Sequence, residues 1–166
     1  MKADKIYLVG FMGAGKTTVA RALARRLDWK IEDIDERIEQ RERRDIPTIF
    51  RQEGEPYFRG IERQELIALL PMRGAVIATG GGTIVDPVTR ELMLRDGAVI
   101  WLDASLATVL ERVPLDGRRP LAADRIEMER LYNQRLMAYG EAHLRLDVGK
   151  SSVEELVDQI VDWLGA

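Results

Sequence analysis

The sequence predicts an α/β fold in which helices cover both faces of a mostly parallel sheet. Apolar runs at residues 5–10, 29–33, 75–79, 98–103 and 144–148 are typical of strands, and longer stretches with helical spacing lie between them. The runs at 75–79 and 98–103 are almost wholly apolar, as in strands that a parallel sheet buries on both faces. Strands that alternate with helices favour right-handed crossovers and a ligand site outside the carboxyl ends of the strands.

The helices are predicted from the spacing of their apolar residues. Residues 153–164 repeat valine, leucine and isoleucine at helical spacing behind Ser152 and Glu155, a pair that is typical of a helix start. Residues 106–113 repeat the same apolar pattern. Residues 36–70 predict two or three helices before the chain returns to a strand.

Composition limits the classes of protein to which the chain can belong. Its 166 residues predict a single domain, 1–166. Without cysteine and with one histidine, His143, the chain has no disulfide, and a zinc cluster or a Ser-His pair is almost excluded. The net charge of -3 gives no reason to expect nucleic-acid binding. We expect a cytoplasmic protein, because neither a signal peptide nor an uncharged apolar run of about 18 residues is visible.

A glycine-rich loop follows the first predicted strand. Residues 10–17, GFMGAGKT, match the pattern G-x-x-x-x-G-K-[ST] and precede a helical run at 18–27. Such a loop wraps backbone N–H groups around phosphate oxygens; the alternative is a turn that only joins strand to helix. Lys16 is expected to reach the β- and γ-phosphates, and the Thr17 hydroxyl to ligate Mg²⁺. With Asn133 as the only asparagine, the guanine-reading pattern N-K-x-D is absent, which favours ATP.

Two aspartates close the second predicted strand. Asp33 and Asp35 stand two residues apart, a spacing that places both carboxylates on one side of an extended segment. One carboxylate is suited to hold Mg²⁺ through water, and the other to accept a proton from an attacking hydroxyl. The alternative for Asp33 is a helix cap, with Glu36 at the third helical position.

Arginines and a second glycine run are further candidates. Arg59, with Glu62 three residues on, and Arg135 stand among aromatic and aliphatic residues on predicted helices. Each is either a bidentate partner for a carboxylate or phosphate, or a solvated surface residue. The glycines at 80–82 follow a buried strand and provide either close backbone approach to a ligand or a flexible bend.

The segment 114–125, PLDGRRPLAADR, is polar and non-helical and lies between two helices. A connection of this kind within a compact domain is often a lid over the ligand site. It carries Arg118 and Arg119, which suggests closure onto the transferred phosphoryl group.

The segments GFMGAGKTT, DIDERIE, GEPYFRGIER, ATGGG, RRPL and QRLMAYGEAH together resemble the shikimate kinase family over nearly the whole chain. The resemblance implies a three-layer α/β/α P-loop kinase fold, with a five-stranded parallel sheet in the order 2-3-1-4-5 and a mobile lid. It implies ATP- and Mg²⁺-dependent transfer of a phosphoryl group to the 3-hydroxyl of shikimate, in aromatic amino-acid biosynthesis. We also expect the chain to be a monomer. The alternatives are a related small-molecule kinase, such as gluconate kinase, and a non-catalytic shikimate-kinase-like binding domain.

The resemblance also implies a role for individual residues. It places the shikimate-binding region at about 33–62 and the lid at about 114–125. The implied catalytic residues are Lys16, Asp35 and Arg119, and the implied Mg²⁺ residues are Thr17 and Asp33. Shikimate is expected on Asp35, Arg59, Gly80, Gly81, Gly82 and Arg135, with Glu62 steadying Arg59. ATP is expected on Gly10, Gly13, Ala14, Gly15, Lys16, Thr17, Thr18, Arg112 and Arg119.

Overall fold

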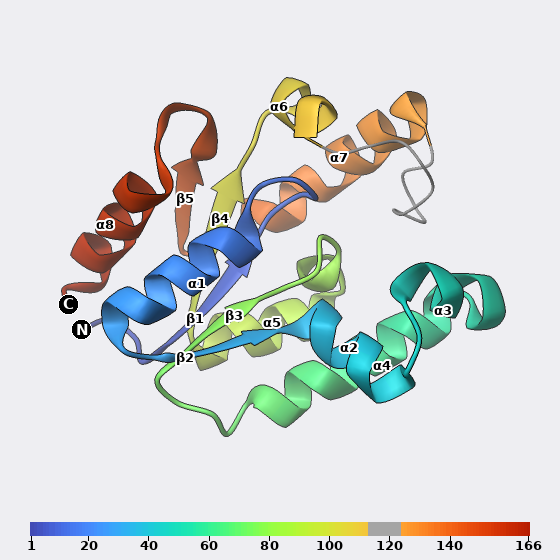
Figure 1. The fold of residues 1–166 in the computed structure, drawn as a ribbon, viewed down its shortest axis with the longest axis horizontal. Coiled ribbons are helices and arrows are strands. Elements are labelled where there is room, and N and C mark those ends of the chain that lie inside the picture. Colours follow the sequence, from blue (N-terminus) through green and yellow to red (C-terminus); the bar gives the residue numbers. More distant parts are fainter. Residues whose placement is uncertain (113–123) are drawn as a thin grey trace.

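The computed structural model describes residues 1–112 and 124–166, and these form a five-stranded parallel sheet. The sheet has the order β2-β3-β1-β4-β5 (Figure 1). The predicted α/β class and strand order are therefore confirmed. The strands are β1 (Lys5–Val9), β2 (Lys30–Asp33), β3 (Ala75–Ala78), β4 (Ala98–Asp103) and β5 (Leu144–Asp147).

Helices lie on both faces of the sheet. On one face α1 packs beside α8, and α5 lies against β4 on the other (Figure 1). The predicted helical region 36–70 holds three helices, α2, α3 and α4. Within the described residues no helix is both long and apolar enough to span a membrane. The helices are α1 (Lys16–Leu27), α2 (Ile34–Glu42), α3 (Ile46–Glu53), α4 (Glu55–Leu69), α5 (Pro87–Asp96), α6 (Leu106–Arg112), α7 (Arg125–Tyr139) and α8 (Val153–Leu164), with short 3₁₀ turns η1 (Thr83–Val85) and η2 (Val148–Lys150).

Helix starts follow their capping residues. The Ser152 side chain accepts a hydrogen bond from the Glu155 backbone N–H at 3.1 Å and begins α8 as predicted. In the same way Asp33 caps α2 by accepting from the Glu36 N–H. Helix α1 begins at Lys16, two residues earlier than predicted, because the left-handed Gly15 (φ 90°) ends the loop directly before it.

The core lies around the three central strands. Every residue of β1 and β3 is buried, as are the first five of β4, while β2 and β5 at the sheet edges are partly exposed. The near-continuous apolar runs predicted to be buried on both faces therefore occupy the centre of the sheet. This rigid centre places the loops that follow β1, β2 and β3 at one edge, where the candidate site lies.

A buried ion pair fixes the opposite end of the sheet. Lys5 is fully buried, and its ammonium donates to the Leu69 and Leu70 carbonyls and to Asp96 Oδ2 at 2.5 Å. Tyr7 donates its phenolic hydrogen to the same carboxylate oxygen at 2.6 Å. Burial opposes the charge on Asp96, but the hydrogen bonds from Lys5 and Tyr7 outweigh it and hold the pKa of that carboxyl below its ordinary value. This cluster joins β1 to the ends of α4 and α5.

Candidate active site

The glycine-rich loop joins β1 to the N-terminus of α1. Within it, Lys16 Nζ donates to the Gly10 carbonyl at 2.6 Å and to the Phe11 carbonyl at 3.2 Å. Gly10 itself packs closely on β4, since an added Cβ would lie 2.5 Å from the Leu102 carbonyl oxygen. A lysine curled over a loop at a helix N-terminus has the arrangement that binds phosphate.

Thr17 and Asp33 meet beside this loop. The Thr17 hydroxyl donates to Asp33 Oδ2 at 3.0 Å, while Asp33 Oδ1 accepts from the Glu36 N–H at 3.1 Å. Asp33 therefore caps α2 and also faces the phosphate loop, so the two interpretations of this residue are compatible. A hydroxyl and a carboxylate beside a phosphate-binding loop suit Mg²⁺, which takes few protein ligands and completes its shell with phosphate oxygens and water.

Asp35 lies in the first turn of α2 and not in an extended segment. The prediction that strand alternation aligns its carboxylate with that of Asp33 is therefore wrong. The reason is the cap at Asp33, which starts the helix one residue before Asp35, so the two-residue alternation of a strand does not apply there. Asp35 and Gly80 line the same cavity. They lie close together, since a Cβ added at Gly80 would lie 2.9 Å from Asp35 Oδ1.

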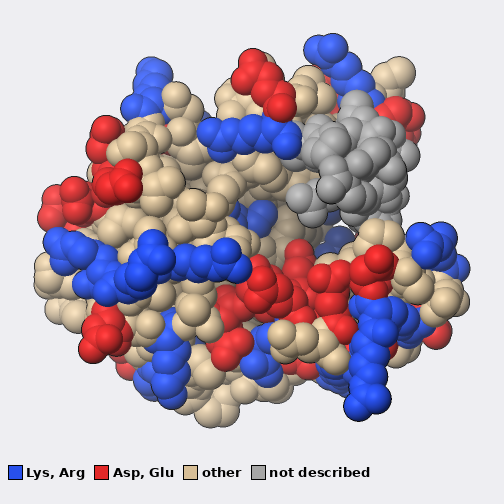
Figure 2. All heavy atoms as spheres, viewed as in Figure 1, with Lys and Arg blue, Asp and Glu red and all other residues tan. Residues whose placement is uncertain are grey.

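That cavity brings the predicted acceptor residues together. It has a volume of about 220 Å³, and its polar wall comprises Asp35, Glu39, Arg59, Glu62, Arg135 and the glycines 80–82. Met12 from the phosphate loop lines it as well, so the two glycine segments share one site. Figure 2 shows this face of the molecule hollowed near its centre, with acidic side chains gathered beside the hollow and basic side chains inside it.

The two arginines are held by neighbours within the protein. Arg59 Nη1 donates to Glu62 Oε1 at 3.0 Å, in the predicted three-residue spacing. Arg135 is only 5% exposed, and its guanidinium carbon lies 5.6 Å from the centroid of the Phe11 ring, a cation–π distance. Neither is a freely solvated surface arginine, and two such groups at one cavity suit a carboxylate.

The glycine run is required by close packing against these arginines. A Cβ at Gly81 would lie 2.8 Å from Arg135 Nη1, and one at Gly82 would lie 2.5 Å from Arg59 Nη2. Positive φ angles occur elsewhere in the described chain but at none of these three glycines, so space and not backbone conformation demands glycine here. Side chains at Gly81 and Gly82 would displace the guanidinium groups.

Tyr139 fixes the same run from α7. Its hydroxyl donates to the Gly81 carbonyl at 2.6 Å, and its ring stacks on Trp101. Burial raises the pKa of Tyr139 to about 12, so the hydroxyl remains a donor at neutral pH. A carbonyl bound in this way argues against a flexible bend.

Comparison with known proteins identifies the family, since residues 12–165 match the family model described as Shikimate kinase. The chain belongs to the shikimate kinase family. A shikimate kinase from Sulfurihydrogenibium sp. (strain YO3AOP1) is 43% identical, over 94% of this chain and 95% of its own. The shikimate kinase from Persephonella marina (strain DSM 14350 / EX-H1) is 41% identical, over 94% of this chain and 96% of its own. The predicted family and its kinase function are confirmed.

Solved shikimate kinases share the whole architecture. The enzyme from Acinetobacter baumannii in complex with shikimate has a TM-score of 0.91 at 36% identity, covering 97% of this chain and 92% of that one. The enzyme from Aquifex aeolicus vf5 has a TM-score of 0.88 at 34% identity, covering 97% and 96%. The P-loop kinase fold expected of a shikimate kinase is thereby confirmed.

Two predicted nucleotide contacts have different outcomes. Arg112 Nη1 donates to the Gly13 carbonyl at 3.1 Å, which holds Arg112 against the phosphate loop, and its contact with ATP stays a prediction. Arg119 and most of the predicted lid lie outside the described residues. The last two residues of the lid segment, Asp124 and Arg125, are the N-cap and first residue of α7.

The sequence did not reveal the site roles of Thr83 and Tyr139, or a second cavity. That cavity, about 650 Å³, adjoins the first through Arg59, Gly82 and Arg135 and extends toward Arg130 on α7. Tyr139 stands one helical turn after Arg135, a spacing that signals a shared helix face. Thr83 directly follows the glycine run, but nothing local indicates its partner on α4.

Proposed function

We propose that the chain transfers the γ-phosphoryl group of ATP to the 3-hydroxyl of shikimate, giving shikimate 3-phosphate and ADP in aromatic amino-acid biosynthesis. The observation that carries this proposal is the single cavity in which the phosphate loop, Asp35, Arg59 and Arg135 meet. Its volume of about 220 Å³ suits a small acceptor. The family membership supplies the reaction class.

ATP is proposed to bind along the first glycine loop. The loop backbone and the α1 N-terminus face the phosphates, and Lys16 moves from the loop carbonyls to the β- and γ-phosphates. Thr17 and Asp33 are the residues that would hold Mg²⁺, and the ion would neutralise charge on the phosphates. The proposed ATP contacts are Gly10, Gly13, Ala14, Gly15, Lys16, Thr17, Thr18, Arg112 and Arg119.

Shikimate is proposed to bind across the cavity from the phosphate loop. Arg59 and Arg135 hold its carboxylate, because both arginines line this cavity and a guanidinium group binds a carboxylate through paired hydrogen bonds. At the other end of the ring Asp35 binds hydroxyls and accepts the proton of the attacking hydroxyl, or orients it. The glycines 80–82, which line the same cavity, are proposed to admit the ring and to donate backbone N–H groups to it.

Catalysis in this scheme consists mainly of positioning and charge neutralisation. The loose transition state of phosphoryl transfer asks for little covalent help from a protein. On the strength of the resemblance, Arg119 neutralises charge on the moving phosphoryl group, and closure of the lid excludes water that would otherwise hydrolyse ATP.

Retention of Lys16, Asp33 and Asp35 favours an active kinase over a non-catalytic binding domain. Gluconate kinase, the other alternative, need not keep Arg59 paired with Glu62 beside a glycine run. We further propose that the enzyme acts as a monomer in the cytoplasm.

ADP release in a coupled assay, with and without shikimate, tests the proposed function. Shikimate should stimulate ADP release strongly, and gluconate should not. Equal rates with and without shikimate, or stimulation by gluconate alone, would refute the proposed acceptor. Removal of Mg²⁺ by a chelator should abolish the stimulated rate.

A further inference from the structure

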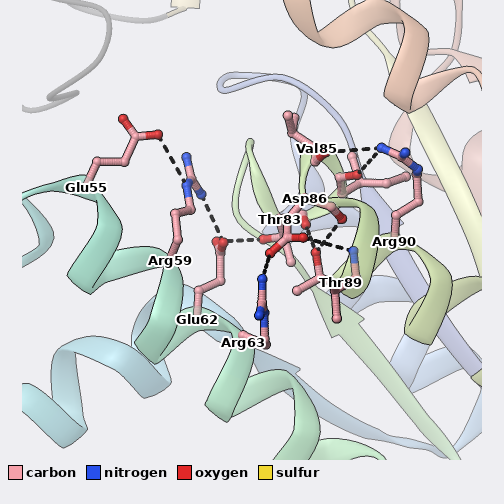
Figure 3. Close-up of polar contacts among 11 residues, drawn as sticks. Glu55, Arg59, Glu62, Arg63, Thr83, Val85, Asp86, Thr89 and Arg90 are labelled. Carbon is pink, nitrogen blue, oxygen red and sulfur yellow. Dashed lines mark hydrogen bonds and ion pairs between the residues drawn. The ribbon is translucent and has the colours of Figure 1, made fainter.

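The carboxylate of Glu62 is shared between two partners that come from different parts of the chain. It is 1% exposed, and its Oε1 accepts from Arg59 Nη1 at 3.0 Å. Its second oxygen, Oε2, accepts from the hydroxyl of Thr83 at 2.9 Å (Figure 3). Both carboxylate oxygens are therefore hydrogen-bonded, and together these bonds fix the plane of the group.

Arg59 depends on Glu62 for its direction. Among the described residues its other ion-pair partner is Glu55, 3.6 Å from Nε and 47% exposed at its side chain, a geometry and an exposure that make a weak contact. The nearly buried Glu62, at 3.0 Å, is the stronger anchor. A rotation of the Glu62 carboxylate would therefore carry the guanidinium of Arg59 with it.

Thr83 is placed to prevent that rotation. It is fully buried, its backbone N–H donates to the Gly80 carbonyl at 3.3 Å, and its β-branched side chain has few rotamers. The hydroxyl has a single hydrogen, and this is donated to Glu62. Thr83 thus connects the glycine run to the arginine that packs against it.

The turn that carries Thr83 is itself fixed on two sides. Thr89 on α5 donates its hydroxyl hydrogen to the Thr83 carbonyl, and Arg90 donates to the Ile84 and Val85 carbonyls at 3.1 Å each. From α4, Arg63 pairs with Asp86 at the end of the turn (Figure 3). The hydroxyl of Thr83 therefore has a rigid base from which to orient Glu62.

We propose that Thr83 is a positioning residue for the acceptor carboxylate, acting through Glu62 on Arg59. The proposal rests on the proposed binding of shikimate, and it makes Thr83 specific for the acceptor half of the site. Loss of its hydroxyl should weaken the binding of shikimate. The binding of ATP, which is proposed to occupy the other glycine loop, should stay nearly unchanged.

The test compares Thr83→Val, which removes the hydroxyl at nearly constant volume, with Thr83→Ser, which keeps it. Thr79→Val is the matched control, because Thr79 is also buried and donates its hydroxyl to the Leu8 carbonyl, away from Glu62. For each variant we would measure the shikimate Kd by calorimetry, the KM for shikimate and ATP, kcat, and the midpoint of thermal unfolding.

Thr83→Val should raise the Kd and KM for shikimate about tenfold. This is the loss expected when a misoriented Arg59 gives up one hydrogen bond with the shikimate carboxylate. The KM for ATP should stay within about twofold of the wild-type value. Thr83→Ser keeps the hydroxyl and should therefore bind shikimate nearly as tightly as the wild type. Thr79→Val should lower the unfolding midpoint without that change in shikimate binding. If Thr83→Val does not fold, Thr83→Ala can replace it in the comparison, because alanine also lacks the hydroxyl and is smaller than valine.

A double variant shows whether Thr83 acts through Glu62. With Glu62→Gln already present, adding Thr83→Val should raise the shikimate Kd little further, because the two residues belong to one chain of contacts. Additive effects would overturn the proposal, as would a Thr83→Val enzyme that is less stable but binds shikimate normally. If the wild type binds shikimate but does not phosphorylate it, the proposed reaction is refuted. The role of Thr83 would still be tested, because the shikimate Kd of each variant can be measured without turnover.

Discussion

Replacement of Gly82 by alanine should weaken shikimate binding without unfolding the protein. The added Cβ would lie 2.5, 2.8 and 2.9 Å from Nη2, Nη1 and Cζ of Arg59. Since carbon contacts settle near 3.5–4.0 Å, the guanidinium must move by about 1 Å. Arg59 reaches Gly82 with the far end of a flexible side chain, so the backbone need not move.

The size of the effect follows from the contact that is lost. A displaced guanidinium gives up its aligned hydrogen bonds with the acceptor carboxylate, worth about 1.5–3 kcal/mol. We therefore expect the KM for shikimate to rise about 10- to 150-fold, with the KM for ATP nearly constant. Steady-state kinetics with each substrate varied in turn, together with thermal unfolding, measures both halves of the prediction.

Gly60→Ala is the matched control. Gly60 follows Arg59 on α4, and a Cβ there would meet nothing within 4 Å. Alanine in a helix should raise the free energy of unfolding by about 0.5–1 kcal/mol and leave both KM values unchanged. A Gly82→Ala enzyme with the wild-type KM for shikimate would refute the reasoning that glycine is needed here to admit Arg59.

Four further variants test the rest of the site and the fold. Lys16→Ala should lower kcat by about 100-fold or more while the protein stays folded, as kinetics and circular dichroism would report. Asp35→Asn should retain ATP binding in calorimetry but lose phosphorylation of shikimate; normal turnover would refute its role. Tyr139→Phe removes the donor to the Gly81 carbonyl and should lower the free energy of unfolding by about 1–2 kcal/mol, measured in urea. Because the pKa of Asp96 is held below its ordinary value, its charge stabilises the fold above about pH 4, and this contribution is lost as the pH falls further. The Asp96→Asn variant should therefore have a lower free energy of unfolding than the wild type at pH 7, and it should lose less of that free energy on acidification. Parallel profiles of the free energy of unfolding against pH for the two proteins would contradict this.

The sequence predicted the parts of the site that local patterns define. The phosphate loop is recognisable because its glycines, Lys16 and Thr17 must stand at fixed spacing between a strand and a helix. The pairing of Arg59 with Glu62 is predictable for the same reason, as a three-residue spacing on one helix face. These features depend on neighbours within about one helical turn.

Long-range contacts were beyond such reasoning. Thr83 lies 21 positions from Glu62, and Lys5 lies 91 positions from Asp96, so no local spacing connects either pair. The error at Asp35 has a local cause, since a capping aspartate began a helix where an extended segment was expected. For Thr83 and Lys5, by contrast, the tertiary structure decided which of several plausible partners each polar residue meets.

A crystal structure with shikimate, ADP and Mg²⁺ would test the central claim most directly. The account predicts the shikimate carboxylate within hydrogen-bond distance of Arg59 and Arg135, and the 3-hydroxyl at Asp35 facing the phosphate loop. Shikimate bound instead in the adjoining cavity toward Arg130, or with its carboxylate turned away from both arginines, would contradict it.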